Sequence, residues 1–222
     1  MHTECPLCHN KTFQLKKISA KNRSYNLCSS CELIQMGKEF LINEKAEKER
    51  YLLHDNSITN IGYSNYLKEI IKKYISPYLK TEDCILDFGS GQEAVLSEIL
   101  KKQGYKNISA YDNYFAEDKS VLNKKYNGII AIEVIEHITD IRKILSLLCS
   151  MLFFNGYLII HSLFHNNIDF KKWWYAEDIT HVTFLSEITI KKISEVFKLE
   201  IINLSKSACV FKKIKKSKIR LQ

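Results

Sequence analysis

The chain of 222 residues is predicted to form an α/β domain with a mostly parallel sheet and helices on both faces. From Tyr63 onwards, apolar runs of strand length alternate with amphipathic helical segments. The run 84–88 leads directly into Gly89-Ser90-Gly91, and a helical pattern follows at once. Two short runs near the end, 199–204 and 208–211, can pair antiparallel. A parallel sheet with an antiparallel C-terminal strand pair is therefore expected.

Helices are expected on both sides of the first strand. The earlier one has apolar residues at helical spacing and ends or kinks at Pro77. The later one follows the glycine turn and stops at Gly104. The apolar positions are Tyr63, Tyr66, Leu67, Ile70, Ile71, Tyr74 and Ile75 in the earlier helix, and Ala94, Val95, Leu96, Ile99 and Leu100 in the later one.

The same alternation continues to the end of the chain. Residues 128–134 form an apolar strand, and residues 157–160 form another after a turn at Asn155-Gly156. Asp140 and Ser186 each stand where a side chain caps a following helix. These elements complete the expected sheet and its helical layers.

One interval is too short for the regular pattern. Only 14 residues separate Asp112 from Asn127, and a helix, a strand and a second helix do not fit there. Either the third strand is a stub around Val121-Leu122, or this part of the sheet is trimmed.

The glycine turn indicates a nucleoside-binding unit. Gly89 and Gly91 permit tight backbone geometry and let a ligand approach the main chain closely. About 20 residues further on, the run 108–111 ends in Asp112, whose carboxylate can accept hydrogen bonds from both hydroxyls of a ribose. An ordinary strand-to-helix turn is the alternative, and the acid at this distance makes it the less favoured one.

Four of the seven cysteines form two close pairs, Cys5-Pro6-Leu7-Cys8 and Cys28-Ser29-Ser30-Cys31. The pairs lie 19 residues apart, a spacing that matches a zinc ribbon, with chance clustering or a redox pair as the alternative. A closed site of four cysteines has no open position, so its role should be structural. Cys84, Cys149 and Cys209 lie in apolar runs and are predicted to be small core residues.

These patterns divide the chain into four parts: a zinc ribbon at 1–35, a connector at 36–60, the main domain at 61–212 and a basic tail at 213–222. No stretch approaches 18 uninterrupted apolar residues, so no membrane span is expected. The start of the chain lacks an apolar signal segment, and the cysteine usage favours a reducing compartment. The expected location is the cytoplasm.

The net charge of +8 is a weak indication of nucleic-acid binding because of its distribution. The last eleven residues carry six basic residues and no acid, which leaves +2 for residues 1–211. A short basic end of this kind is more often solvated than a binding arm.

With these motifs in place, the chain resembles the class I S-adenosylmethionine-dependent methyltransferases, which have a Rossmann-like fold. More narrowly, it resembles an uncharacterised bacterial group that carries an N-terminal zinc ribbon. The resemblance rests on the cysteine pairs, the glycine turn and a run of Glu-Val-Ile-Glu-His at 133–137. Further matching segments are 50–56, Gly62-Tyr63, Tyr111-Asp112, Trp174-Tyr175 and 178–182.

The resemblance implies a set of cofactor contacts. Asp87, Gly89 and Gly91 would line the methionine part of S-adenosylmethionine, and Asp112 would hold its ribose. Glu133 would border the sulfonium end. Glu93 stands where the family usually has a third glycine, and its carboxylate could favour the cofactor's positive charge or crowd the pocket.

Two histidines are candidates for catalysis. His137 follows the strand end where such proteins bring the substrate to the methyl group, and His181 lies in the loop that would roof the site. Either could be a general base or a substrate ligand. The alternative for both is a structural histidine bonded to a neighbouring loop. Residues 173–175 are an aromatic substrate wall or the packing that seals the lid, and Tyr51 and His54 could gate the cofactor.

The leading functional prediction is methyl transfer from S-adenosylmethionine to a small molecule. One alternative is an RNA methyltransferase that uses the ribbon and the basic tail to hold phosphates. The other is a non-catalytic zinc-ribbon interaction protein on a methyltransferase scaffold, which Glu93 favours. The sequence makes no prediction about the acceptor atom or the oligomeric state.

Overall fold

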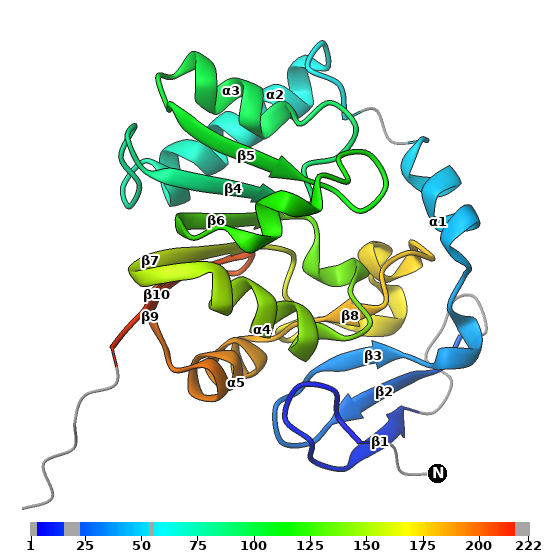
Figure 1. The fold of residues 1–222 in the computed structure, drawn as a ribbon. Coiled ribbons are helices and arrows are strands. Elements are labelled where there is room, and N and C mark those ends of the chain that lie inside the picture. Colours follow the sequence, from blue (N-terminus) through cyan, green and yellow to red (C-terminus); the bar gives the residue numbers. More distant parts are fainter. Residues whose placement is uncertain (1–3, 16–22, 54–55, 216–222) are drawn as a thin grey trace, which may run out of the picture.

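The computed structural model describes residues 4–15, 23–53 and 56–215 (Figure 1). Its central sheet has the strand order β5-β4-β6-β7-β10-β9. The first four strands in this order run parallel, and β10 pairs antiparallel with both β7 and β9. The predicted fold class is therefore confirmed. The strands are β4 (Cys84–Phe88), β5 (Asn107–Tyr111), β6 (Tyr126–Ile132), β7 (Leu152–His161), β9 (Leu199–Leu204) and β10 (Ala208–Lys213).

Helices cover both faces of this sheet. On one face, α2 (Ile61–Ile70), the π-helical turn after it (Ile71–Ile75) and α3 (Val95–Lys102) form one buried cluster with apolar side chains of the strands. On the other face, α4 (Ile141–Met151) and α5 (Glu187–Phe197) form a second cluster. Neighbouring strand residues belong to opposite clusters because side chains alternate along a strand.

The predicted helix caps are confirmed. The Asp140 side chain accepts a hydrogen bond from the Lys143 backbone N–H at 3.1 Å. Ser186 and Thr189 form a capping box at the start of α5. Gly104 has a φ of +93° just past α3, as expected for a residue that ends a helix.

The third strand is absent from the described sheet, which ends at β5. The prediction of a strand stub at Val121-Leu122 is wrong, because Lys119–Asn123 form a 3₁₀ helix. The Tyr126 hydroxyl donates a hydrogen bond to the Val121 carbonyl at 2.8 Å and holds this helix against the sheet. The alternative, a trimmed sheet, is the correct one.

Two strand boundaries also differ from the prediction. The strand predicted at 128–134 ends at Ile132, because Glu133 leaves it with a φ of +53°. The strand predicted at 157–160 is part of the longer β7, which begins at Leu152. The predicted turn at Asn155-Gly156 lies within β7, where Asn155 has a φ of +64° and the pairing with β6 is irregular.

The N-terminal part forms a second sheet of antiparallel strands β1 (Thr12–Leu15), β2 (Tyr25–Cys28) and β3 (Ile34–Met36). A fourth strand, β8 (Thr183–Phe184), comes from much later in the chain and pairs with β3 (Figure 1). The second sheet is thus physically joined to the segment that follows β7.

The predicted connector contains a 3₁₀ turn (Lys38–Phe40) and the helix α1 (Glu44–Tyr51). Asn43 caps α1 by accepting from the Ala46 N–H at 2.9 Å. Within the described range 23–53, no residue of α1 is buried. The contacts of its half-buried residues therefore hold it in place.

The remaining cysteines differ in exposure. Cys209 is buried as predicted, and Cys149 is half-buried. The prediction of a core position is wrong for Cys84, which is exposed because it is the first residue of β4, at the amino edge of the sheet. None of the helices in the described ranges is both long and apolar enough to span a membrane.

Candidate active site

A cavity of about 1580 Å³ opens where the parallel strands end. Residues at or just after the carboxyl ends of four neighbouring strands line it, as is usual for ligand sites in open α/β sheets. These residues are Phe88, Gly89, Ser90 and Gly91 after β4, Tyr111 and Asp112 after β5, Ile132 and Glu133 after β6, and His161 in β7.

The glycine turn needs its glycines for two different reasons. Gly89 has a φ of +77°, and a Cβ there would lie 2.3 Å from Cγ2 of Val134. Gly91 has a φ of +69°, but no described atom lies within 4 Å of the position of its Cβ. Gly89 is fixed by close packing, whereas Gly91 presents bare backbone to the cavity. The turn therefore fits a ligand that lies directly against the main chain.

Asp112 connects the turn to the loop after β5. Its Oδ2 accepts from the Gly91 N–H at 3.0 Å, and its Oδ1 accepts from the N–H groups of Tyr114 at 2.9 Å and Phe115 at 3.2 Å. The carboxylate also lines the cavity. Because each carboxylate oxygen has two lone pairs, acceptor capacity remains for a ligand hydroxyl.

Asp87 lies behind the turn. It is only 3 % exposed, is not among the residues that line the cavity, and accepts a hydrogen bond from Ser97 Oγ at 2.8 Å. Burial raises the pKa of Asp87 to about 6, although the hydrogen bond from Ser97 acts to lower it. The residue ties the end of β4 to α3 and supports the turn from below.

We expect Asp87→Asn to raise stability in a pH-dependent way. The folded chain holds the Asp87 proton more tightly than the unfolded chain, so stability is lost as the pH rises from about 4 through about 6. The variant should be more stable by up to about 3 kcal/mol above pH 7, with little difference near pH 4. Urea unfolding at both pH values measures this, and an equal difference at both would contradict it.

Glu93 has a defined partner at the rim of the cavity. Its Oε2 accepts from the Ile58 N–H at 3.0 Å. The side chain is exposed and lines the cavity. In place of a third glycine, the chain thus has a link between the turn and the segment before α2.

A polar cluster that is buried at Glu136, His161 and Tyr175 forms another wall of the site. Oε1 of Glu133 lies 2.9 Å from the Tyr66 hydroxyl and 3.0 Å from His161 Nδ1. The Tyr175 hydroxyl donates to Glu136 Oε1 at 2.6 Å and lies 3.1 Å from Glu133 Oε2. Burial, together with the nearby Glu133, raises the pKa of Glu136 well above its usual range. Burial opposes ionisation of Glu133 as well, but His161 and Tyr66 hold its pKa below its usual range.

Glu133 has the most unusual backbone of this wall. Its φ of +53° is a left-handed conformation that costs a non-glycine residue about 1 kcal/mol or more. The Glu133 N–H donates to the His161 carbonyl at 2.9 Å, which fixes the residue in this conformation. The strain turns the carboxylate towards Tyr66 and His161.

His137 and His181 lie together and both line the cavity, with ring centroids 4.8 Å apart. Nδ1 of His137 bonds the Thr180 carbonyl at 3.0 Å, and Nδ1 of His181 bonds the Tyr175 carbonyl at 2.7 Å. Burial and the neighbouring His181 lower the pKa of His137 to about 3, so its ring is neutral. Each histidine therefore bonds a loop and also faces the cavity.

Two segments cover this wall. Arg50 of α1 donates to Asp178 Oδ2 from Nη2 at 2.7 Å and from Nε at 3.2 Å. Burial works against ionisation of Asp178, but Arg50 and Thr180 hold its pKa well below the usual range. In the same helix, the Tyr51 ring packs edge-on against His137 with centroids 5.1 Å apart. These contacts place α1 and the 173–184 segment over the site.

The aromatic residues 173–175 divide between the two predicted roles. Trp173 is buried in the cluster around β3 and β8. Trp174 is 68 % exposed and lines the cavity. Tyr175 combines the two roles, because its ring is buried in the packing and its hydroxyl reaches the polar cluster of the site.

The sequence profile of the methyltransferase domain family matches residues 62–204. The chain belongs to this family. The resemblance to class I S-adenosylmethionine-dependent methyltransferases is thereby confirmed. A search among curated proteins gave no match.

The chain is similar to several solved methyltransferase structures at low sequence identity. The N-methyltransferase NodS from Bradyrhizobium japonicum, in complex with S-adenosyl-L-homocysteine, is 15% identical, with a TM-score of 0.49, over 77% of this chain and 98% of that one. A possible histamine N-methyltransferase from Thermotoga maritima is 11% identical, with a TM-score of 0.48, over 78% and 96%. An O-methyltransferase family 2 protein from Planctomyces limnophilus, in complex with apigenin, is 11% identical, with a TM-score of 0.50, over 81% and 64%. The chain thus spans less than two thirds of the last protein's length.

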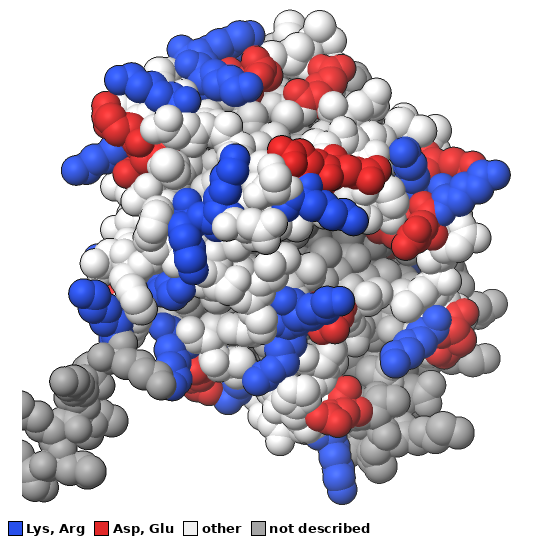
Figure 2. All heavy atoms as spheres, in the orientation of Figure 1, with Lys and Arg blue, Asp and Glu red and all other residues white. Residues whose placement is uncertain are grey.

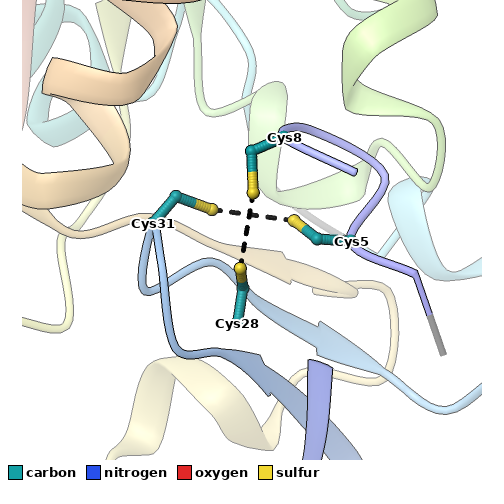
Figure 3. Close-up of side chains that lie close together, drawn as sticks. All are labelled: Cys5, Cys8, Cys28 and Cys31. Atoms are coloured by element: carbon teal, nitrogen blue, oxygen red, sulfur yellow. Dashed lines mark hydrogen bonds between the residues drawn. The ribbon is translucent and has the colours of Figure 1, made fainter. Parts of the chain in front are cut away.

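The N-terminal part of the chain, ahead of the methyltransferase domain, carries the four-cysteine cluster beside the second sheet (Figure 3). The Sγ atoms of Cys5 and Cys31 lie 3.6 Å apart, and those of Cys8 and Cys28 lie 3.5 Å apart. All four lie within 4.8 Å of one another. Tetrahedral zinc with Zn–S bonds of about 2.3 Å would place its sulfurs about 3.8 Å apart. The cluster therefore has the donor set and the size for a metal ion.

This cluster is anchored on the main domain. Cys5, Cys28 and Cys31 are fully buried in the same core cluster as α4 and α5. Thr189 Oγ1 of α5 donates to the Cys31 carbonyl at 2.8 Å. Arg23, just before β2, donates to the carbonyls of residues 176–178, next to Tyr175. The cysteine turns and the covering segment therefore support each other.

Sequence reasoning missed three members of the polar wall. The helical pattern places Tyr66 on an apolar face, whereas its hydroxyl reaches Glu133. His161 has a usable signal in the sequence, since it is a polar residue directly after the run 157–160. Glu136 belongs to the family motif, but its complete burial has no local signal.

Proposed function

We propose that the chain transfers a methyl group from S-adenosylmethionine to a small, polar acceptor. The main support is one cavity that is lined by the glycine turn and Asp112 and also by Glu133, His137 and His181. Ligand pockets usually measure about 300–1,000 Å³. A cavity of about 1580 Å³ has room for a cofactor and a second small molecule.

In this proposal, one end of the cavity holds the cofactor. Gly89 and Gly91 lie under its methionine part with Asp87 supporting them from below, and Asp112 holds the ribose by accepting a hydrogen bond from one of its hydroxyls. Glu133 borders the sulfonium end. Apolar side chains after β5 give the adenine a surface to stack on: Tyr114, Phe115 and Leu122.

The other end holds the acceptor. Bound S-adenosylmethionine supplies a methyl group already activated for in-line displacement, so the protein's main task is to align the acceptor. His137 and His181 are proposed to hold the acceptor or take its proton. Because Nδ1 of His137 bonds a carbonyl and this ring is neutral, its lone pair is on Nε2.

We further propose that Cys5, Cys8, Cys28 and Cys31 bind a structural Zn²⁺ and that residues 1–35, 36–60, 61–212 and 213–222 are the functional parts of the chain. Support for zinc comes from the buried sulfur donors and their spacing. Reduced cysteines also favour the cytoplasm as the compartment. Of the predicted tail, residues 216–222 lie outside the described residues, as does His54.

Cofactor binding provides the first test. In calorimetry, the purified chain should bind S-adenosylmethionine and S-adenosylhomocysteine. Asp112→Asn should weaken the binding of both compounds at least about tenfold, because the ribose loses its charged acceptor. A hydrogen bond to a charged group contributes about 1.5–3 kcal/mol. Glu117→Gln is the matched control, since Glu117 is an exposed acid in the same loop. No binding by the original chain would refute the proposal.

The acceptor class needs a separate measurement. Formation of S-adenosylhomocysteine should require the small-molecule filtrate of a cell extract and should not require its RNA fraction. Figure 2 shows basic side chains lying among acidic ones on the face it displays, so no broad basic surface is visible there. Product formation with RNA alone, falling steeply with salt, would instead support the RNA alternative.

A further inference from the structure

Three potential metal ligands meet beside the cavity, away from the cysteine cluster. Glu136, His137 and His181 each bring one ligand atom, and these atoms lie within 4.8 Å of one another. Glu136 and His137 belong to the 3₁₀ turn Ile135–His137 that follows β6, whereas His181 precedes β8. The fold brings together residues that are more than 40 positions apart in the sequence.

The carboxylate of Glu136 is incompletely satisfied. The side chain is 0 % exposed, and Oε1 accepts from the Tyr175 hydroxyl. Its other oxygen, Oε2, is buried without a hydrogen-bond partner among the described residues. A buried carboxylate oxygen without a partner is costly, and a cation is one of the few groups that can satisfy it.

Both imidazoles have the orientation of metal-binding histidines. His137 and His181 each engage a backbone carbonyl through Nδ1. For the neutral His137 ring, this contact leaves the lone pair on Nε2, and metal-ligating histidines are commonly held in the same way. The two rings are also adjacent, with centroids 4.8 Å apart.

We propose that Glu136, His137 and His181 bind a divalent first-row metal ion. Two nitrogens and one oxygen are donors that suit Mn²⁺, Fe²⁺, Co²⁺, Ni²⁺ or Zn²⁺. Metal bonds of about 2.0–2.2 Å would draw the three atoms closer together than this 4.8 Å limit. The site differs from the cysteine cluster in its donors and in its place in the fold.

Three protein ligands leave coordination positions open. His137 and His181 line the cavity, so the open positions face the space in which the acceptor is expected. An acceptor with oxygen ligands, such as neighbouring hydroxyl or carbonyl groups, would bind the ion there. With the ion bound, the two histidines would hold the acceptor through the metal and would not take its proton themselves. This use of the ion rests on the proposed function, whereas the metal site itself does not.

Co²⁺ titration of the full-length, zinc-loaded chain tests the site, with visible absorption and metal content as readouts. One Co²⁺ per chain should bind in addition to the zinc, without the strong near-ultraviolet bands of cobalt–thiolate bonds. Glu136→Gln and His181→Gln should each weaken Co²⁺ binding about tenfold or more. His181→Gln keeps the test decisive if the buried Glu136→Gln variant fails to fold.

Two control variants should bind Co²⁺ like the original chain. Glu47→Gln removes a carboxylate from the same cavity, outside the cluster. His165→Gln removes a half-buried histidine whose Nε2 bonds the Glu32 carbonyl. The proposal would be overturned if the zinc-loaded chain bound no Co²⁺, or if the two ligand variants bound it as tightly as the original chain. Absorption bands of cobalt–thiolate bonds would overturn it as well. Cofactor calorimetry on the same sample separates this failure from a failure of the proposed function.

Discussion

Replacing Gly89 with alanine is expected to destabilise the chain by about 3–4 kcal/mol and to abolish cofactor binding. Its φ of +77° costs an L-residue about 1–2 kcal/mol, and the new Cβ would lie 2.3 Å from Val134 Cγ2. Val134 is buried, so it has little room to move away. Since a domain is stable by only about 5–15 kcal/mol, denaturant unfolding should show the loss clearly.

Two further variants separate the clash from the conformational cost. Val134→Ala removes the methyl groups that meet the new Cβ, so adding it to Gly89→Ala should recover part of the stability. Gly91→Ala meets no described atom within 4 Å, so it should lose only about 1–2 kcal/mol while still losing cofactor affinity. If Gly89→Ala unfolded at the same denaturant concentration as the original chain, the close packing against Val134 would not be maintained in solution.

Replacing Cys28 with serine is expected to remove the bound zinc and to lower the melting temperature by about 10 °C or more. Zinc binding is part of the folding free energy of such sites, and a loss of about 4 kcal/mol corresponds to this shift in a chain of this size. The variant should destabilise the whole chain and not only the N-terminal sheet, because Cys28 is fully buried in the core cluster shared with α4 and α5. Zinc content and thermal unfolding measure the two effects.

The same variant should also loosen the cover of the candidate active site. β8 pairs with β3, and Arg23 donates to the carbonyls of residues 176–178. Near-ultraviolet circular dichroism should therefore change as Trp173 and Tyr175 lose their fixed packing. Cys84→Ser is the matched control, since this thiol is exposed and should be replaceable without effect. An unchanged melting temperature in Cys28→Ser would contradict a structural role for the cluster.

Features encoded in short segments were predictable from the sequence. Spacing alone was enough to predict the cluster of the cysteine pairs. The glycine turn and an acid about 20 residues later were enough to predict the nucleoside-binding unit. Helix caps at Asp140 and Ser186 are equally local, and the structure confirms them. Helix α1 was missed because it buries no residue in the described range 23–53, although Asn43 before a run of good helix formers was a usable signal.

The sequence by itself thus determined the parallel sheet, the glycine turn with Asp112 and the four-cysteine cluster, because periodicity and spacing act between near neighbours. Only the tertiary structure decided that β8 completes the N-terminal sheet and that Tyr66 and His161 meet at Glu133. It also decided that His181 reaches His137. Such contacts join residues that lie far apart in the chain. They arise from packing and burial, which leave no periodic pattern in the sequence.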